Sequence, residues 1–399
     1  MREQVWQRFS SPGRRDGRRA VVSAAAATAG VVAAVMTVAA LSPAAAAASA
    51  SASASASAGR DTVQEGLDAL VRSDGVPAAL ARVKGPEGHA RTYTAGVADL
   101  ATGSKVPRNG QVRIGSNTKT FTAVLVLQLV GEGKIGLDAT VDTYLPGLVR
   151  GEKIDGRRIT VRELLQHTSG LPDYVKYLGE DVRHYEPREL LDIALQHKGD
   201  FAPGEKWAYS NTNYVLAGLI VEKVTHRPLA KELERRIIKP TGLRHTYFPA
   251  PGDVTIREPH PKGYYQDSAG APLRDGTELD PSWGWAAGQM ISTNSDLNRF
   301  FTALLAGRLL PAAQLAEMRT TVPAGAPFAS GARYGLGLVS TPLSCGGVYW
   351  GHGGSTTGYE TRGGVTADGR AANVAVTVQP SDAATMKRVE RVVDKALCR

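Results

Sequence analysis

Residues 115–130 read GSNTKTFTAVLVLQLV, a short polar segment that runs directly into an almost unbroken apolar one. Residues 121–130 are apolar on nearly every face of a helix, which is typical of a helix buried at the centre of a domain. Ser116 and Lys119 stand three residues apart just before it, and helical spacing places such a pair on one face. The stretch therefore predicts a buried helix with a serine and a lysine at its start.

A lysine in that position can activate the serine. The hydroxyl of an unperturbed serine is a weak nucleophile and needs an adjacent base. Desolvation at the edge of an apolar core lowers the pKa of a lysine, so that its neutral amine can act as that base. We interpret Ser116 as the nucleophile and Lys119 as the base. In the alternative interpretation, Ser116 caps the helix and Lys119 is an exposed residue of its first turn.

Patterns on either side of this stretch indicate strands at both chain ends and helices between them. Helical patterns cover residues 63–74, 161–166, 187–196, 213–225, 229–238, 296–306 and 383–397. Strand patterns cover residues 78–83, 90–98, 334–340, 347–352, 359–366 and 373–378. We predict an α/β (α+β) fold over residues 61–399, in which both chain ends form one antiparallel sheet flanked by helices. A mostly helical subdomain is inserted at about residues 120–330.

The first 60 residues have the composition of an export leader followed by a spacer. Arginines precede an apolar run and a tract of small residues, which predicts an export signal over residues 1–47 and a secreted protein. The pair Arg18-Arg19 suits a twin-arginine route. A retained membrane anchor is the alternative, because the run is about long enough to span a bilayer. Residues 48–60 alternate Ala and Ser and are expected to be a flexible linker.

Charge and cysteine content narrow the classes of partner. The net charge is +9, but no Lys/Arg run is interleaved with aromatic residues, so we expect no nucleic-acid partner. In an exported chain the only two cysteines, Cys345 and Cys398, are expected to form a disulfide. Two cysteines this far apart match no zinc spacing, so we expect neither a metal nor a cofactor. We also expect a monomer.

A second motif, Tyr209-Ser210-Asn211, opens the predicted helix at residues 213–225. A tyrosine hydroxyl near a lysine can carry a proton, and an asparagine amide can orient an amide substrate. We therefore place Tyr209 and Asn211 in the site. The alternative is a surface turn whose side chains cap the next helix.

A third motif, His352-Gly353-Gly354-Ser355, follows a predicted strand. Glycines let the backbone of a substrate approach the edge of a strand and pair with it. His352 is expected to be a cation or a neutral donor beside the nucleophile, and the N–H of Ser355 an oxyanion donor. The alternative is a glycine-rich turn with a surface histidine.

Together, S-x-x-K, Y-x-N and H-x-G in this order resemble the pattern of the penicillin-recognising serine hydrolases. That family includes class C β-lactamases, D-alanyl-D-alanine carboxypeptidases, D-aminopeptidases and β-lactamase-like esterases. The resemblance covers residues 61–399, includes the segment LLQHTSGL at residues 164–171, and is strongest to the secreted carboxypeptidases. It implies a β-lactamase/transpeptidase-like fold and an acyl-enzyme mechanism.

The resemblance also implies a role for each motif residue. Ser116 attacks, and Lys119 and Tyr209 share the proton transfers. The N–H groups of Ser116 and Ser355 form the oxyanion hole. The implied substrate-binding residues are Asn211, Trp283, His352, Gly353, Gly354 and Ser355. Trp283 matches a substrate-lining tryptophan of the carboxypeptidases, the alternative being a core aromatic residue.

Two positions depart from the carboxypeptidase pattern. Val339 stands where those enzymes have an arginine for the terminal carboxylate of the substrate, and Gly353 stands where they have a threonine. Arg333 and Arg362 are the candidates to replace that arginine. We nevertheless expect a D-alanyl-D-alanine carboxypeptidase that acts on peptidoglycan-type peptides, with β-lactams as inhibitors or substrates. The alternatives are an esterase or D-aminopeptidase, a class C-type β-lactamase, and a non-catalytic penicillin-binding module.

Overall fold

The computed structural model describes residues 61–179, 183–268 and 270–399. The expected export signal (residues 1–47) and the Ala/Ser linker (residues 48–60) lie outside these ranges. Among the helices that are described, none combines the length and the apolarity needed to cross a bilayer.

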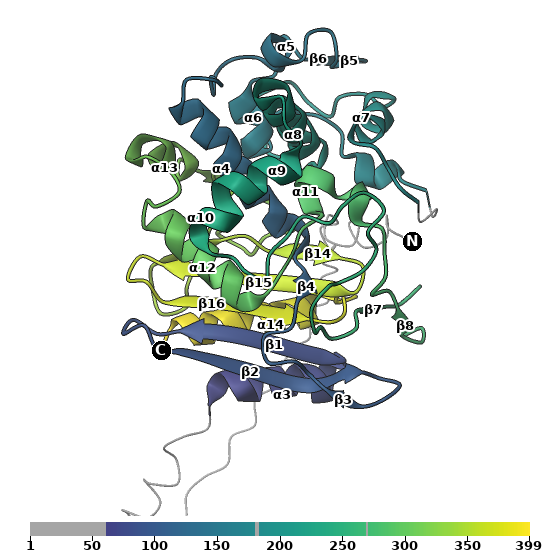
Figure 1. Cartoon of the computed structure of the whole chain (residues 1–399), viewed down its shortest axis with the longest axis vertical. Helices are drawn as coiled ribbons and strands as arrows, with labels where there is room; N and C mark the ends of the chain where they lie inside the picture. The colour runs from purple at the N-terminus through teal and green to yellow at the C-terminus, as the bar shows by residue number, and fades with distance from the viewer. Residues whose placement is uncertain (1–60, 180–182, 269) are drawn as a thin grey trace, which may run out of the picture. The chain divides into compact units, whose positions relative to one another are not determined.

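An antiparallel sheet built from both ends of the described chain forms the centre of the fold (Figure 1). The N-terminal strand β1 lies between β2 and the C-terminal strand β16, which confirms the predicted sheet. The strands in sheet order are β10 (Val322–Pro323), β11 (Arg333–Tyr334), β12 (Val339–Pro342), β13 (Val348–Gly351), β15 (Tyr359–Thr366), β16 (Ala371–Val376), β1 (Ala78–Lys84), β2 (Ala90–Asp99) and β3 (Ser104–Lys105). A further strand, β14 (Gly354–Thr356), pairs with β15.

Alternate residues of β16 serve two hydrophobic cores, because successive side chains of a strand point to opposite faces. Val374 packs with helices α3 (Thr62–Asp74) and α14 (Ala383–Leu397). Ala375 belongs to the larger core, together with helix α12 (Asn294–Leu305). Helices therefore cover both faces of the sheet, as predicted.

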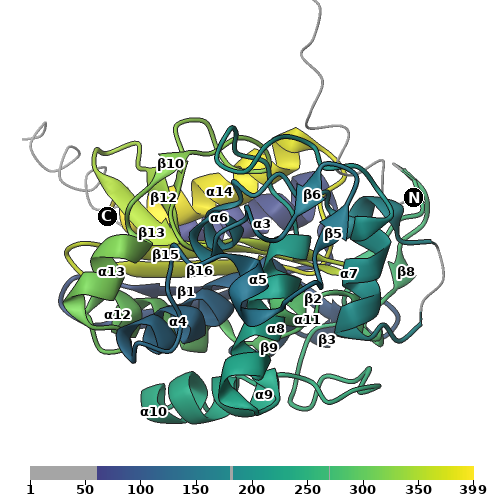
Figure 2. The same cartoon turned by 90° about the horizontal axis from the view of Figure 1, so that it is seen from above.

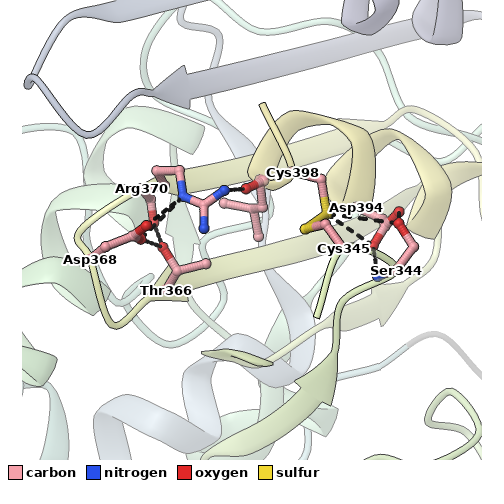
Figure 3. The surroundings of a disulfide bond; sticks show 8 residues. Ser344, Cys345, Thr366, Asp368, Arg370, Asp394 and Cys398 are labelled. Carbon is pink, nitrogen blue, oxygen red and sulfur yellow. Dashed lines mark hydrogen bonds and ion pairs between the residues drawn. A yellow bond between two sulfur atoms is a disulfide. The ribbon is translucent and has the colours of Figure 1, made fainter. Parts of the chain in front are cut away.

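The disulfide between Cys345 and Cys398 joins the end of α14 to the loop before β13 (Figure 3). Their Cα atoms are 5.7 Å apart, so the expected cysteine pair is present as a bond. Asp394 of α14 also accepts a hydrogen bond of 2.8 Å from the N–H of Ser344. The guanidinium of Arg370 donates to the carbonyl of Leu397. The last helix is thus attached to the sheet at several points.

The predicted buried helix is α4 (Thr118–Gly131), and every side chain from Thr118 to Leu127 is buried. The ring of Phe121 stacks on Phe300 of α12 with centroids 3.7 Å apart. Figure 1 shows α4 in the helical layer above β15 and β16, and Figure 2, seen from above, shows α4 beside α12 and α13. The other helices are α5 (Val141–Tyr144), α6 (Val161–Gln166), α7 (Pro187–Leu195), α8 (Thr212–Thr225), α9 (Leu229–Leu233), α10 (Lys239–Thr241), α11 (Trp285–Gly288) and α13 (Ala312–Met318).

Short turns and two-residue strands connect these helices. The 3-10 turns are η1 (Gly115–Asn117), η2 (Tyr174–Tyr177) and η4 (Pro281–Trp283), and a π-helical turn, η3 (Glu234–Ile238), follows α9. The paired short strands are β4 (Val112–Arg113) with β9 (Ile291–Ser292), β5 (Arg150–Gly151) with β6 (Ile154–Asp155), and β7 (Tyr264–Tyr265) with β8 (Arg274–Asp275).

The prediction of one continuous strand over residues 334–340 is wrong. The segment forms the end of β11, a tight connection and the start of β12, and Tyr334 pairs with Val339. Gly337 adopts a φ of +73°, which a chiral residue rarely adopts. A Cβ atom at Gly335 would lie 2.1 Å from the carbonyl oxygen of Met318. These two glycines allow the chain to reverse where periodicity alone indicated a strand.

Candidate active site

Ser116 lies on η1, immediately before α4, and is half-buried. Lys119 follows in the first turn of α4 and is fully buried, with Nζ 3.0 Å from Oγ of Ser116. Asn117, rather than Ser116, occupies the N-cap position of α4 and makes no capping bond through its side chain. The alternative of a capping serine with an exposed lysine is therefore wrong.

The surroundings of Lys119 orient its amine toward the serine. Nζ also lies 2.7 Å from Oδ1 of Asn211 and 2.8 Å from the carbonyl oxygen of Ala287. Both of these oxygens can only accept hydrogen bonds. A neutral amine has two N–H groups, and donating both to these oxygens leaves its lone pair facing Ser116. This is the arrangement that a general base requires.

Burial makes the neutral amine accessible near neutral pH. Desolvation lowers the pKa of Lys119 from 10.5 to about 7, and the nearby carboxylate of Asp173 opposes this change. A group with a pKa near the working pH is well suited to accept and return a proton. Lys119 can therefore take the proton of Ser116 without a second base.

Asp173 is a site residue that sequence reasoning missed. Its buried carboxylate accepts hydrogen bonds from the backbone N–H of Asn211 at 3.1 Å and from Nδ2 of Asn211 at 3.1 and 3.2 Å. Because Nδ2 is engaged in this way, Oδ1 of Asn211 is turned to Lys119. Asp173 stands 38 residues before Asn211. No local spacing connects the two residues, and only the fold brings them together.

Tyr209 contacts both Ser116 and Lys119. Its hydroxyl hydrogen-bonds to Ser116, and its ring centroid is 4.8 Å from Nζ of Lys119. Burial raises the pKa of Tyr209 well above its usual value of 10, despite that hydrogen bond. The phenol therefore keeps its proton at neutral pH, which suits it to donate rather than to act as a phenolate base.

Two glycines bring the third motif against the nucleophile. Gly115 has a φ of +47°, and a Cβ atom there would lie 2.8 Å from the carbonyl oxygen of Ser355. A Cβ atom at Gly354 would lie 2.0 Å from the carbonyl oxygen of Ile114. Since only glycine permits this approach, the backbone carrying the N–H of Ser116 lies directly beside that of Ser355. Two N–H groups placed in this way can stabilise an oxyanion.

A buried ion pair lies behind this strand. Glu360 pairs with Ser355 across the β14–β15 hairpin and is fully buried, and the guanidinium of Arg362 contacts its carboxylate. Burial raises the pKa of Glu360 to about 7. Sequence reasoning missed Glu360, although two charged residues inside an otherwise buried strand were a usable signal. A Cβ atom at Gly353 would lie 2.5 Å from the Arg362 guanidinium, so a side chain at this position would displace it.

Neither arginine proposed as a carboxylate ligand is available for that role. Arg362 is engaged with Glu360, and exposed Arg333 donates both to the hydroxyl and to the carbonyl of Thr321. Val339 is buried in a small cluster with Tyr334. The apolar side chain of Val339 is therefore not replaced by an unengaged guanidinium of Arg333 or Arg362.

His352 is almost fully buried, so the alternative of a surface histidine is wrong. Desolvation and the nearby charge of Lys119 lower its pKa to about 3, which makes it neutral at physiological pH. Of the two expected forms, cation or neutral donor, the structure favours the neutral one.

A cavity of about 600 Å³ leads to the nucleophile. Ser116, Asn211, Trp283 and Ser355 line it, so half-buried Trp283 faces the cavity. The charged residues on its wall are Lys176, Asp267, Asp275 and Glu278. Among the residues that the structure describes, Asp267 and Asp275 are paired with Arg274 and Lys262, whereas exposed Glu278 makes no ion pair.

Comparisons with known proteins show which families and structures this chain is similar to. The family model described as Beta-lactamase matches residues 18–396. Over 169 residues the chain is 33% identical to a Salmonella schwarzengrund protein named "Putative D-alanyl-D-alanine carboxypeptidase", covering 40% of this chain and 39% of that protein. The chain thus spans about two fifths of the length of the curated relatives it matches.

Two solved structures match over nearly their whole length. A D-stereospecific amidohydrolase from Streptomyces sp. is 41% identical with a TM-score of 0.76, and the match covers 83% of this chain and 97% of that one. A D-amino acid amidase from Ochrobactrum anthropi SV3 is 29% identical with a TM-score of 0.75, covering 84% and 96%.

Proposed function

The chain belongs to the β-lactamase family of serine hydrolases, and we propose that it hydrolyses amides of D-amino acids whose α-amino group is free. In this reaction Lys119 takes the proton of Ser116 as its hydroxyl attacks the amide carbon. The oxyanion forms against the N–H groups of Ser116 and Ser355. Tyr209 donates a proton to the leaving amine, and the C–N bond breaks. Lys119 then passes the serine proton to Tyr209 and is neutral again. Water attacks the resulting ester, Lys119 takes the proton of that water and returns it to Oγ of Ser116, and the C–O bond breaks to release the D-amino acid.

The charge of the cavity wall carries the substrate assignment. The wall has three carboxylates and one ammonium group, and unpaired Glu278 is placed to receive a cation. A substrate with a free α-ammonium group supplies that cation, and a hydrogen bond between charged groups contributes about 1.5–3 kcal/mol. The match to a D-stereospecific amidohydrolase and to a D-amino acid amidase supports the same assignment.

A D-alanyl-D-alanine carboxypeptidase is the second candidate, because Lys176 lines the same cavity and could receive a terminal carboxylate. The curated Salmonella relative carries that name. Two observations count against this candidate. Val339 is apolar and cannot bind a carboxylate, and Arg333 and Arg362 are both engaged with other groups.

A panel of substrates separates these candidates. We would compare D-alanine p-nitroanilide, its N-acetyl derivative, its L-enantiomer, diacetyl-L-Lys-D-Ala-D-Ala, nitrophenyl butyrate and nitrocefin, with Ser116→Ala as the inactive control. The proposal predicts preferential turnover of the free D-anilide. Turnover of the tripeptide with none of the anilide supports the carboxypeptidase instead. Turnover of only the ester or only nitrocefin overturns both, and full activity of Ser116→Ala overturns the mechanism.

We also propose that the protein acts after export from the cytoplasm. The disulfide between Cys345 and Cys398 supports this, because such bonds persist in oxidising compartments. Mass spectrometry of culture supernatant should detect a chain that begins between residues 44 and 61. Recovery of the full-length protein only from the cytoplasm would contradict export.

A further inference from the structure

A continuous chain of hydrogen bonds joins the loop that carries Tyr209 to the strand that carries Ser355. The side chain of Tyr334 forms its centre. The Tyr334 hydroxyl lies 3.2 Å from Nε2 of His167 and 3.0 Å from Nε2 of His352. His167, Tyr334 and His352 are each at most 3% exposed, so protein groups rather than solvent determine where their protons lie.

At one end, the surroundings of His167 determine its tautomer. Nδ1 of His167 accepts from the backbone N–H of Ser210, 3.2 Å away, and Nδ2 of Asn213 lies 3.0 Å from the same atom. Because Nδ1 is an acceptor, the proton of the neutral ring is on Nε2. Nε2 therefore donates to Tyr334. His167 belongs to the segment at residues 164–171, to which the sequence analysis gave no chemical role.

At the other end, His352 has the opposite tautomer. Its Nδ1 lies 2.5 Å from the carbonyl oxygen of Gly353, which can only accept, so Nδ1 carries the proton. Burial keeps the ring neutral, and Nε2 is then an acceptor that needs a donor. The hydroxyl of Tyr334 supplies it. Neighbouring Tyr214 also hydrogen-bonds to Tyr334, but it is not the donor, because its own hydroxyl proton goes to the carbonyl of Leu165. Since the Tyr214 hydroxyl is already satisfied by that bond, the buried Nε2 of His352 is the acceptor that needs the Tyr334 proton.

We propose that Tyr334 is a positioning residue that holds His352 as the neutral Nδ1–H tautomer. In this form His352 binds the carbonyl of Gly353 and fixes the start of the strand that presents the N–H of Ser355. The same chain is anchored at Ser210, beside Tyr209. The proton donor and the oxyanion hole are thereby held relative to each other through Tyr334.

The tautomers can be measured directly in the wild-type protein. Nitrogen-15 NMR of a histidine-labelled sample at pH 7 should show His352 protonated on Nδ1 and His167 protonated on Nε2, with assignments from single histidine variants. An imidazolium signal, or a proton on Nε2 of His352, overturns the proposal. This measurement needs no substrate, so its outcome is independent of the proposed amidase activity.

The variant Tyr334→Phe keeps the ring and removes only the hydroxyl. We expect kcat to fall about tenfold with KM little changed, since two buried ring nitrogens lose their partner. The NMR signal of His352 should move toward a mixture of tautomers. Tyr349→Phe is the matched control, because Tyr349 is buried on β13 of the same sheet and its hydroxyl contacts Thr341 instead.

Equal kcat and an unchanged His352 spectrum in Tyr334→Phe would overturn the proposal. An equal loss of kcat in both tyrosine variants would do so too, because it would indicate general destabilisation. If Tyr334→Phe does not fold, the nitrogen-15 spectrum of the wild-type protein still tests whether His352 is protonated on Nδ1. Kinetics would be followed with whichever acyl substrate the panel identifies, and acylation by a fluorescent penicillin serves if none is turned over.

Discussion

The residues around the nucleophile and the residues on the cavity wall differ in burial and in bonding. In the catalytic floor (Ser116, Lys119, Asp173, Tyr209 and Asn211), the buried amine of Lys119 meets three oxygens within 3.0 Å. On the cavity wall (Lys176, Asp267, Asp275 and Glu278), Lys176 and Glu278 are exposed. The floor is buried and closely hydrogen-bonded around the nucleophile, whereas the wall is open to solvent and, in the function proposed above, selects the substrate. Variants of the two regions should therefore affect different kinetic constants.

Lys119→Met should have the largest effect. Loss of a general base lowers the rate by about 10²–10⁴-fold, with KM changed far less. In the wild-type enzyme the base works only when it is unprotonated. The rate should therefore be low below pH 7, rise through the pKa of about 7 and level off above it. A pH–rate profile of kcat measures this, and a profile that falls as pH rises through 7 would show that Lys119 acts as a cation.

Asp173→Asn should have the next largest effect. Its carboxylate holds the amide of Asn211, and misplacement of a catalytic group by about 1 Å costs up to about 10²-fold in rate. Since the charge of Asp173 raises the pKa of Lys119, its removal should also move the rising limb of the pH profile to lower pH. Asp192→Asn is the control, because the side chain of Asp192 lies on the solvent-facing side of α7. If Asp173→Asn keeps the wild-type kcat and its pH profile does not shift, Asp173 does not position Asn211 or raise the pKa of Lys119.

Sequence reasoning identified the parts of the catalytic floor that have short-range signals. Ser116 and Lys119 are three residues apart before an apolar helix, and Tyr209 and Asn211 belong to one tripeptide. The contact between Asp173 and Asn211 depends on how η2 packs against the start of α8. The spacing of apolar residues in the sequence carries no information about this packing. The fold was largely predictable, because α4, α14 and the terminal strands have clear patterns. The reversal at Gly335 and Gly337 was missed, since apolar residues flank it as in a strand.

The charged residues of the cavity wall were not predicted. Glu278 and Lys176 are ordinary charged residues in loops and turns, and nothing in their local sequence distinguishes them from other surface charges. Their importance comes from the cavity, which forms only when η2, η4 and the loop after β8 meet near Ser116. This explains why the reaction class followed from the sequence while the substrate did not.

Glu278→Gln should affect binding rather than turnover. We expect KM for a D-amino acid anilide to rise about tenfold with kcat retained, because one charge-assisted hydrogen bond is lost equally from the ground and transition states. The N-acetylated substrate should not respond, as it has no ammonium group. Lys176→Gln is the matched control on the same wall and should leave KM for the anilide unchanged or lower it. A tenfold effect on kcat instead would place Glu278 among the catalytic residues.

Replacing both Cys345 and Cys398 by serine should have the smallest effect on catalysis. The bond closes a loop of 53 residues, and on the loop-entropy model its loss lowers the free energy of unfolding by about 4 kcal/mol. Thermal unfolding should therefore show a Tm lower by several degrees, with kcat and KM unchanged at 25 °C. The remaining bonds of α14, including Asp394 to Ser344, should hold the helix in place. A fall in kcat would instead reveal coupling from α14 to the catalytic floor, and Glu390 of α14, 3.9 Å from Arg362, is the contact through which it would pass.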